Sequence, residues 1–266
     1  MKEDGRSRKG QSRGLDRGLR NRIKIDSRLT PVTIAADNIL DRVIIEVAHG
    51  PLVKLTETAL HPNLLKELKR QAVRFQDGDK VRKNFSKALA MYVAAAQAGD
   101  AEAQFNVGTY LENGIGTVRD PKAAVAWHMR SAQQKYPSGQ YALGRCFSEG
   151  IGVAKSEKKA QRYFLLAAKQ GDSDAQYALG LAYRHGRGVS RDFAKGLQWL
   201  RLAAEQGHPE AQFSVGLAYA RGEGTDIDFD EAENWYTKSA GQGDEDARHN
   251  LENLKAVRKE VEASLS

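Results

Sequence analysis

Hydrophobic and polar positions recur along this chain with a fixed period of 36 residues. Segments 101–136, 137–172, 173–208 and 209–244 align without a gap, and a more divergent copy precedes them at 65–100. Each copy holds two short stretches in which apolar residues follow the spacing of amphipathic helices. We therefore expect each copy to form two helices joined by a turn, at about 101–113 and 121–134 in the first full copy. The first half of a sixth copy follows from residue 245.

Two kinds of residue mark the expected helix contacts. Glycine inside a helix costs about 1 kcal/mol relative to alanine, so its recurrence at one position predicts close helix packing. A large aromatic residue recurs in the second helix, where we expect it to lie in the core. These structural positions are Gly108, Gly144, Gly180, Gly216, Trp127, Trp199 and Trp235.

Capping residues delimit the second helix of each copy. Asp120, Ser156, Asp192 and Asp228 occupy one position just before it, where a side-chain oxygen can accept from the free N–H groups of the first turn. Glycines that favour the left-handed conformation follow the helix at Gly171, Gly207 and Gly243. Residues 135–136 break that pattern, which predicts a different turn after the first full copy.

A Gly-x-Gly sequence joins the two helices in four copies, at Gly114/Gly116, Gly150/Gly152, Gly186/Gly188 and Gly222/Gly224. A phosphate-binding loop would follow a strand and carry a Gly-Lys-Ser/Thr ending or a longer glycine fingerprint. These loops follow a helix and lack both additions. We interpret the glycines as turn residues that permit positive φ.

This pattern resembles the Sel1-like repeat, a relative of the tetratricopeptide repeat. The matching residues are Ala-x-x-x-x-Gly in the first helix (Ala175 to Gly180), the Gly-x-Gly loop, the aspartate before the second helix, the tryptophan and Ala203-Ala204. The resemblance covers about 65–250. It implies an all-α fold, a right-handed α-solenoid with an extended concave surface, and a role as a non-enzymatic adaptor or scaffold that binds a segment of another protein in regulation or complex assembly.

The first helix lines the concave side in related arrays. One stripe of this helix varies between copies while its neighbours stay constant, as expected for a binding surface and also for simple solvent exposure. The candidate partner-binding residues are Glu102, Asn106, Thr109, Asn113, Arg145, Glu149, Leu181, His185, Ser214, Leu217 and Arg221.

The two ends differ from the array. Residues 1–30 carry ten Lys/Arg against four acids and few apolar residues, which predicts a basic disordered tail. Residues 31–60 predict a small α+β segment, with a helix near 31–42 and a β-hairpin of 43–47 and 52–56. The array spans 61–244. Residues 245–266 predict a capping helix, with a partner-binding or self-association helix as the alternative.

The basic tail supports an alternative function, a nucleic-acid-associated adaptor whose phosphate contacts come from Arg6, Arg8, Lys9, Arg13, Arg17 and Arg20. Residues 1–60 contain no Phe, Trp or Tyr to stack on bases, so we expect weak binding at most.

The remaining residues predict no catalytic, metal or cofactor site. The six histidines are scattered, and the Ser156-x-x-Lys159 match falls in the capping position. No secretory signal or membrane-spanning run is visible, and a lone Cys146 fits a reducing compartment, so we expect a cytoplasmic protein without a membrane partner.

Overall fold

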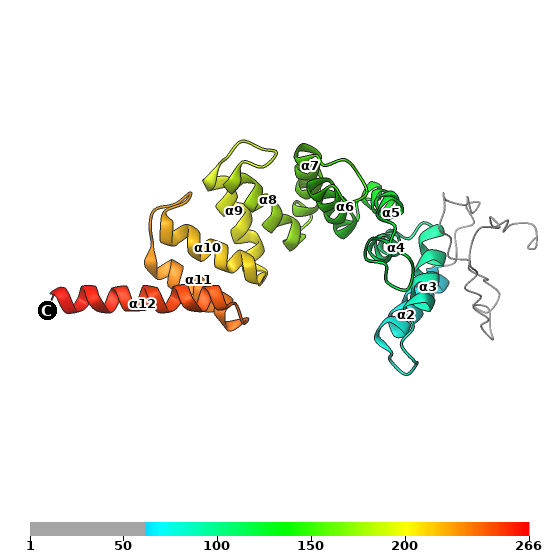
Figure 1. The fold of residues 1–266 in the computed structure, drawn as a ribbon, viewed down its shortest axis with the longest axis horizontal. Coiled ribbons are helices and arrows are strands. Elements are labelled where there is room, and N and C mark those ends of the chain that lie inside the picture. The colour runs from blue at the N-terminus through cyan, green and yellow to red at the C-terminus, as the bar shows by residue number, and fades with distance from the viewer. Residues whose placement is uncertain (1–61, 266) are drawn as a thin grey trace, which may run out of the picture. The chain divides into compact units, whose positions relative to one another are not determined.

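The computed structural model describes residues 62–265, which form eleven helices and no strand (Figure 1). The helices are α2 (Pro62–Asp77), α3 (Phe85–Gln97), α4 (Ala101–Asn113), α5 (Pro121–Gln133), α6 (Pro137–Glu149), α7 (Glu157–Ala168), α8 (Ser173–His185), α9 (Phe193–Glu205), α10 (Pro209–Arg221), α11 (Phe229–Gly241) and α12 (Glu245–Leu265). The predicted tail 1–30 and the helix and hairpin expected at 31–60 lie outside the described residues.

The chain divides into two units, 1–123 and 124–266, and α5 crosses the boundary between them. In the first unit, α2 packs against α3 and α3 against α4. In the second unit, each helix from α6 to α12 packs against the next. The expected solenoid of helix pairs is confirmed, and the observed bounds of α4 and α5 lie within one residue of those expected.

Side chains cap most helices of the array. Asp192 Oδ1 accepts from the Lys195 N–H at 2.9 Å at the start of α9, and the expected caps Asp120, Ser156 and Asp228 make the same kind of bond. No side chain caps α6. The first helices α4, α8, α10 and α12 are capped, at positions that the sequence analysis did not single out. They are Asp100, Asp172, His208 and Asp244.

The Gly-x-Gly loops are turns, as expected. Gly186 ends α8 with φ +70°, and its N–H donates to the carbonyl of Ala182. The second glycine has a further role, because a Cβ on Gly188 would lie 2.7 Å from the backbone carbon of Glu157, at the start of the preceding second helix. The loop glycines therefore turn the chain and also let consecutive copies approach closely.

The turn after α5 corrects one expectation. Lys135 adopts φ +63° where Gly171 has φ +92° one copy later, and the backbone hydrogen bonds follow the same pattern in both turns. The prediction of a different turn there was wrong. A left-handed residue other than glycine costs about 1–2 kcal/mol, which the surrounding helices of the repeat offset.

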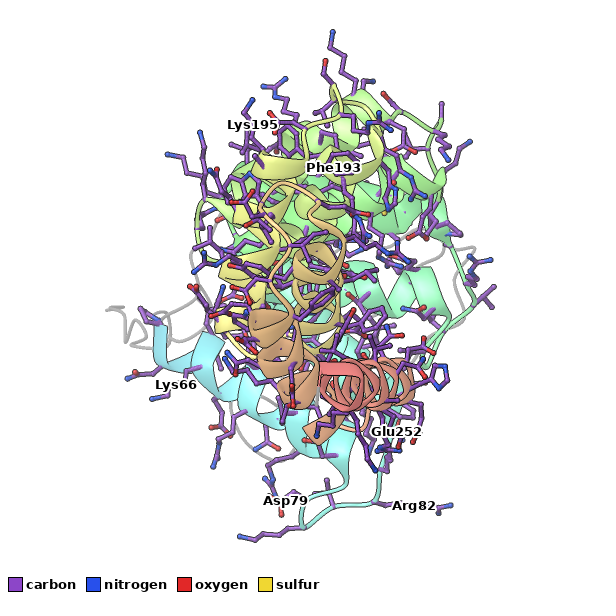
Figure 2. All side chains as sticks on the ribbon, turned by 90° about the vertical axis from the view of Figure 1, so that its left-hand side faces the viewer. Lys66, Asp79, Arg82, Phe193, Lys195 and Glu252 are labelled. Atoms are coloured by element: carbon purple, nitrogen blue, oxygen red, sulfur yellow. The ribbon has the colours of Figure 1, made fainter. Side chains whose placement is uncertain are left out.

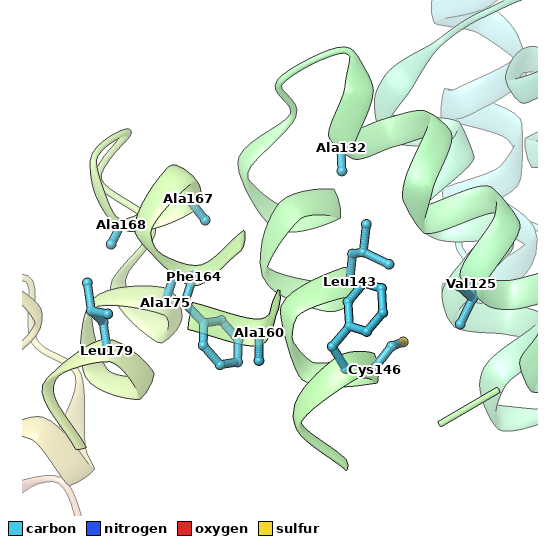
Figure 3. Packing of buried hydrophobic residues seen from close by; sticks show 11 residues of the cluster. Val125, Ala132, Leu143, Cys146, Ala160, Phe164, Ala167, Ala168, Ala175 and Leu179 are labelled. Atoms are coloured by element: carbon cyan, nitrogen blue, oxygen red, sulfur yellow. The ribbon is translucent and has the colours of Figure 1, made fainter. Parts of the chain in front are cut away.

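The core of the second unit lies between successive helices. Figure 3 shows one part of it, in which Leu143 and Phe164 meet between α6 and α7, and Leu179 of α8 faces α7. A Cβ on Gly180 would lie 2.7 Å from Cγ of Leu200, which confirms close packing at the helix glycines. In the tryptophan column, Trp127 and Trp235 are buried, whereas Trp199 is half-buried.

Buried glutamines bond neighbouring copies together. Gln176 Nε2 donates to the carbonyl of Ala168 at 3.1 Å, which joins α8 to the preceding α7. Its Oε1 accepts from Gln206 Nε2 at 2.7 Å, at the end of α9. Gln140 and Gln212 make the same pair of bonds in the adjacent copies.

Candidate protein-binding face

The candidate stripe residues of the first unit bond mainly within their own helix. Asn106 Nδ2 donates to the carbonyl of Glu102, and Asn113 Nδ2 donates to that of Thr109, at 3.0 and 2.9 Å. Thr109 also donates to a carbonyl one turn earlier in α4. Glu102 pairs with Lys69 of α2, 2.7 Å away. These contacts leave few outward-facing donors on α4.

In the second unit, the stripe residues lie at different depths. Leu181 and Leu217 are half-buried, whereas His185, Arg221 and Glu149 are exposed. Arg145 Nη1 lies 3.9 Å from Glu149 Oε2. Ser214 is buried and donates to the carbonyl one turn earlier at 2.8 Å. Ser214 therefore supports the face from beneath and offers no surface donor.

An aromatic row lies one turn before these residues, and the sequence analysis missed it. It consists of Tyr141, Tyr177 and Phe213, one from each of α6, α8 and α10, all half-buried. Each ring is held from one side by another ring: Phe164, His208 and Tyr236 lie 5.7, 4.7 and 5.8 Å away respectively, measured between centroids. The signal was present in the sequence, because an aromatic residue recurs at this position in all four full copies.

We define the first-helix face as the surface formed by Tyr141, Arg145, Tyr177, Leu181, Phe213 and Leu217. Contacts between copies make it continuous from α8 to α10, since the Tyr177 ring lies against His208 at the start of α10. Burial raises the pKa of Tyr177, and the carboxylate of Glu210 raises it further. Burial likewise raises the pKa of Tyr141, and Asp174 adds to the effect. Both phenols are therefore neutral hydrogen-bonding groups at neutral pH.

The two ends of this face differ in charge. Asp174 and Glu210 are exposed at the starts of α8 and α10. His185 and Arg221 are exposed at the ends of the same helices. Burial, followed by Arg184 and Arg187, lowers the pKa of His185, so its ring is neutral near pH 7.

His208 fixes the position of the Tyr177 ring. It occupies a capping position that is aspartate in three other copies, and its Nδ1 accepts from the Ala211 N–H at 3.3 Å. Its Nε2 lies 3.3 Å from Asp174 Oδ1, which ties α8 to the start of α10. Glu210 Oε2 lies 3.2 Å from Nδ1. This side chain is enclosed between the two helices and organises the acidic end of the face.

The other candidate residues are structural or undescribed. Ser156 serves as the cap of α7, as expected from its position. Cys146 is completely buried in α6. The tail residues of the nucleic-acid alternative lie outside the described range. Within residues 62–265, no helix combines the length and apolarity needed to cross a bilayer.

These features define a class of protein, the helical-repeat solenoids, whose copies each contribute one helix to a shared face. Five matches to the Sel1 repeat model cover residues 72–100, 101–136, 137–172, 173–208 and 209–244, and the chain belongs to the Sel1 repeat family. Proteins of this family are typically non-enzymatic scaffolds for protein–protein interaction.

Two solved structures support this assignment. A Sel1 repeat protein from Oxalobacter formigenes is 33% identical, with a TM-score of 0.65, over 72% of this chain and 78% of that one. A protective antigen of uropathogenic Escherichia coli with an SLR fold is 30% identical, with a TM-score of 0.66, over 70% of this chain. The match spans only 40% of the antigen's length. No curated protein matches the sequence.

Proposed function

We propose that the first-helix face of the second unit binds a segment of a partner protein, and that the chain acts as a cytoplasmic adaptor in regulation or complex assembly. The observation that carries this proposal is the row of Tyr141, Tyr177 and Phe213 beside Leu181 and Leu217, all half-exposed. Aromatic residues held rigidly by their neighbours are the residue type that dominates binding energy at protein interfaces.

The charges at the two ends of the face select the partner's chemistry. A segment that crosses α8 and α10 would place an apolar side chain over Leu181 and Leu217. A lysine or arginine on the same segment would pair with Asp174 and Glu210, which are exposed and lie next to the Tyr177 ring. Complementary charge of this kind contributes mainly specificity and association rate.

Paired leucine substitutions test the proposal. Leu181→Glu with Leu217→Glu places two charges on the face, whereas Leu166→Glu with Leu202→Glu makes the same change on the exposed side of α7 and α9. Both variants must first show the same helical circular dichroism as the wild type. We expect proteins captured from lysate by the wild type to be lost with the first variant and retained with the second. Equal retention by both variants would contradict the proposal.

A further inference from the structure

The outer side of α2 is polar where later first helices are apolar. Glu67, Gln71 and Arg74 occupy the positions that Ala175, Leu179 and Ala182 hold in α8. In α8 these positions are buried, and the first two belong to the core cluster shared with the preceding α7. The surface that contacts the preceding copy is apolar elsewhere in the array, and at α2 the same surface is polar.

The polar residues of α2 satisfy one another. Arg70 donates two bonds to the carboxylate of Glu67, both at 2.9 Å, and Gln71 donates a third at 2.7 Å. Arg74 Nη1 donates to Gln71 Oε1 at 3.2 Å. Hydrogen bonds from Arg70 and Gln71 lower the pKa of Glu67, so this carboxylate stays ionised. A polar outer face of this kind is typical of the terminal repeat of a solenoid.

The side chain of Lys80 occupies the space that a preceding helix pair would need in order to pack on α2. Lys80 occupies the position of the second loop glycine, with φ +56°. In later copies, a Cβ at this position would lie 2.6 Å (Gly116) or 2.7 Å (Gly188) from the backbone of the preceding second helix. A copy stacked on α2 in the same way would collide with the Lys80 side chain.

A hollow of about 570 Å³ lies beside α2 and the turn that follows it, lined by Arg70, Val73, Arg74, Asp79 and Lys80. Its lining holds three cations and one carboxylate. Val73, which occupies the position of Leu181 and Leu217 in later copies, is 44% exposed within it and leaves an apolar surface to be covered. Asp79 lies on the turn between α2 and α3, and Figure 2 shows Arg82 at a separate point of that turn.

We propose that residues 31–61 of this chain dock on this hollow and close the array at its first copy. This segment ends at the residue before α2, and Val73 lies about 17 Å further along that helix, well within its reach. It carries four acids (Asp37, Asp41, Glu46, Glu57) against two bases (Arg42, Lys54), which complements the cationic lining. Its apolar runs 43–47 and 52–55 supply side chains to cover Val73. Residues 1–30 carry a net charge of +6 and would be repelled.

A photoreactive label at Val73→Cys in the full chain tests this proposal. The only native cysteine, Cys146, is completely buried, so the label reacts at the engineered site. We expect cross-linked peptides to map to residues 31–61. Mixing labelled ¹⁴N protein with unlabelled ¹⁵N protein separates adducts within a chain from those between chains. The control, Val118→Cys, is more exposed, at 67%, in the loop of the next copy, and should give no adduct to 31–61.

A charge variant sharpens the test. Arg74→Glu reverses a charge in the hollow and should lower the cross-link yield to 31–61 several-fold. Arg82→Glu, in the turn between α2 and α3 and not among the lining residues, should leave the yield unchanged. Adducts to residues 1–30, adducts between chains, or the absence of adducts to 31–61 would each overturn the proposal. These outcomes do not test the proposed binding function of the first-helix face of the second unit. The inference does not rest on that function.

Discussion

Single residues in the loops determine how closely consecutive copies approach. Two demands require glycine at position 188: its φ is positive, and the neighbouring backbone lies so close that a Cβ does not fit. At Gly171 only the first demand applies, because a Cβ there would meet nothing within 4 Å. Gly-x-Gly could be recognised as a turn from its residue types and the preceding helix. Its contact with the previous copy could not be predicted, because Gly188 and Glu157 are 31 positions apart in the sequence.

Substituting these two glycines separates the two demands. Gly171→Ala should lower the free energy of unfolding by about 1–2 kcal/mol, the cost of a left-handed alanine. Gly188→Ala adds a collision with the backbone of Glu157 and should cost about 1–3 kcal/mol more. Urea denaturation of both variants measures the difference. Equal losses would show that the loop yields without disturbing its neighbour.

Helix pairs are joined by buried polar bonds as well as by apolar packing. The sequence determined the helix ends well, because Asp192 and its equivalents cap locally and glycine follows most of the helices. The glutamine column was also visible as a constant polar position within an apolar helix face. Its partners could not be predicted, since Gln176 bonds to one residue of the preceding copy and to another 30 residues later.

Gln176→Ala tests the role of these glutamine hydrogen bonds. The substitution removes two hydrogen bonds, the one to the carbonyl of Ala168 and the one from Gln206, while that carbonyl keeps its bond from the Gly171 N–H. At about 0.5–1.5 kcal/mol for each bond, it should destabilise the protein by about 1–3 kcal/mol. Gln206→Ala removes the exposed side chain that donates to Gln176. Water can replace this bond, so the substitution should cost less than about 1 kcal/mol. A reversed order in denaturant melts would contradict the assigned role.

The tryptophan column provides a second test of the helix pairs. Trp235 is 6% exposed, so Trp235→Ala should cost about 3–5 kcal/mol. Trp199 is only half-buried, and Trp199→Ala should cost less. Thermal melts of the two variants give the comparison. A melting temperature of the Trp235 variant equal to that of the wild type would show that this side chain is not part of the core.

Across the whole molecule, buried tyrosines make stability depend on alkaline pH. Burial raises the pKa of five of them, Tyr92, Tyr110, Tyr141, Tyr177 and Tyr236. A group whose pKa is higher in the folded than in the unfolded state stabilises the fold fully below its unfolded pKa of about 10. That contribution is lost as the pH rises through the folded pKa.

We therefore expect the free energy of unfolding to fall as the pH rises above about 10, with tyrosinate absorbance appearing as the protein unfolds. Tyr177→Phe removes one of the titrating groups from the first-helix face, so its stability should fall less steeply with pH than that of the wild type. Parallel urea melts between pH 8 and pH 11.5 measure both slopes. An unchanged slope in the variant would exclude Tyr177 as a contributor.

The central claim is that the first-helix face of the second unit holds a partner. A photo-crosslinking amino acid placed in the cell at Tyr177, at Leu217 and, as the control, at Leu202 tests it most directly. Leu202 is exposed on the second helix of its copy, away from the face. The account predicts that Tyr177 and Leu217 cross-link the same protein and that Leu202 does not. Cross-links from Leu202 alone, or at equal yield from all three positions, would contradict it.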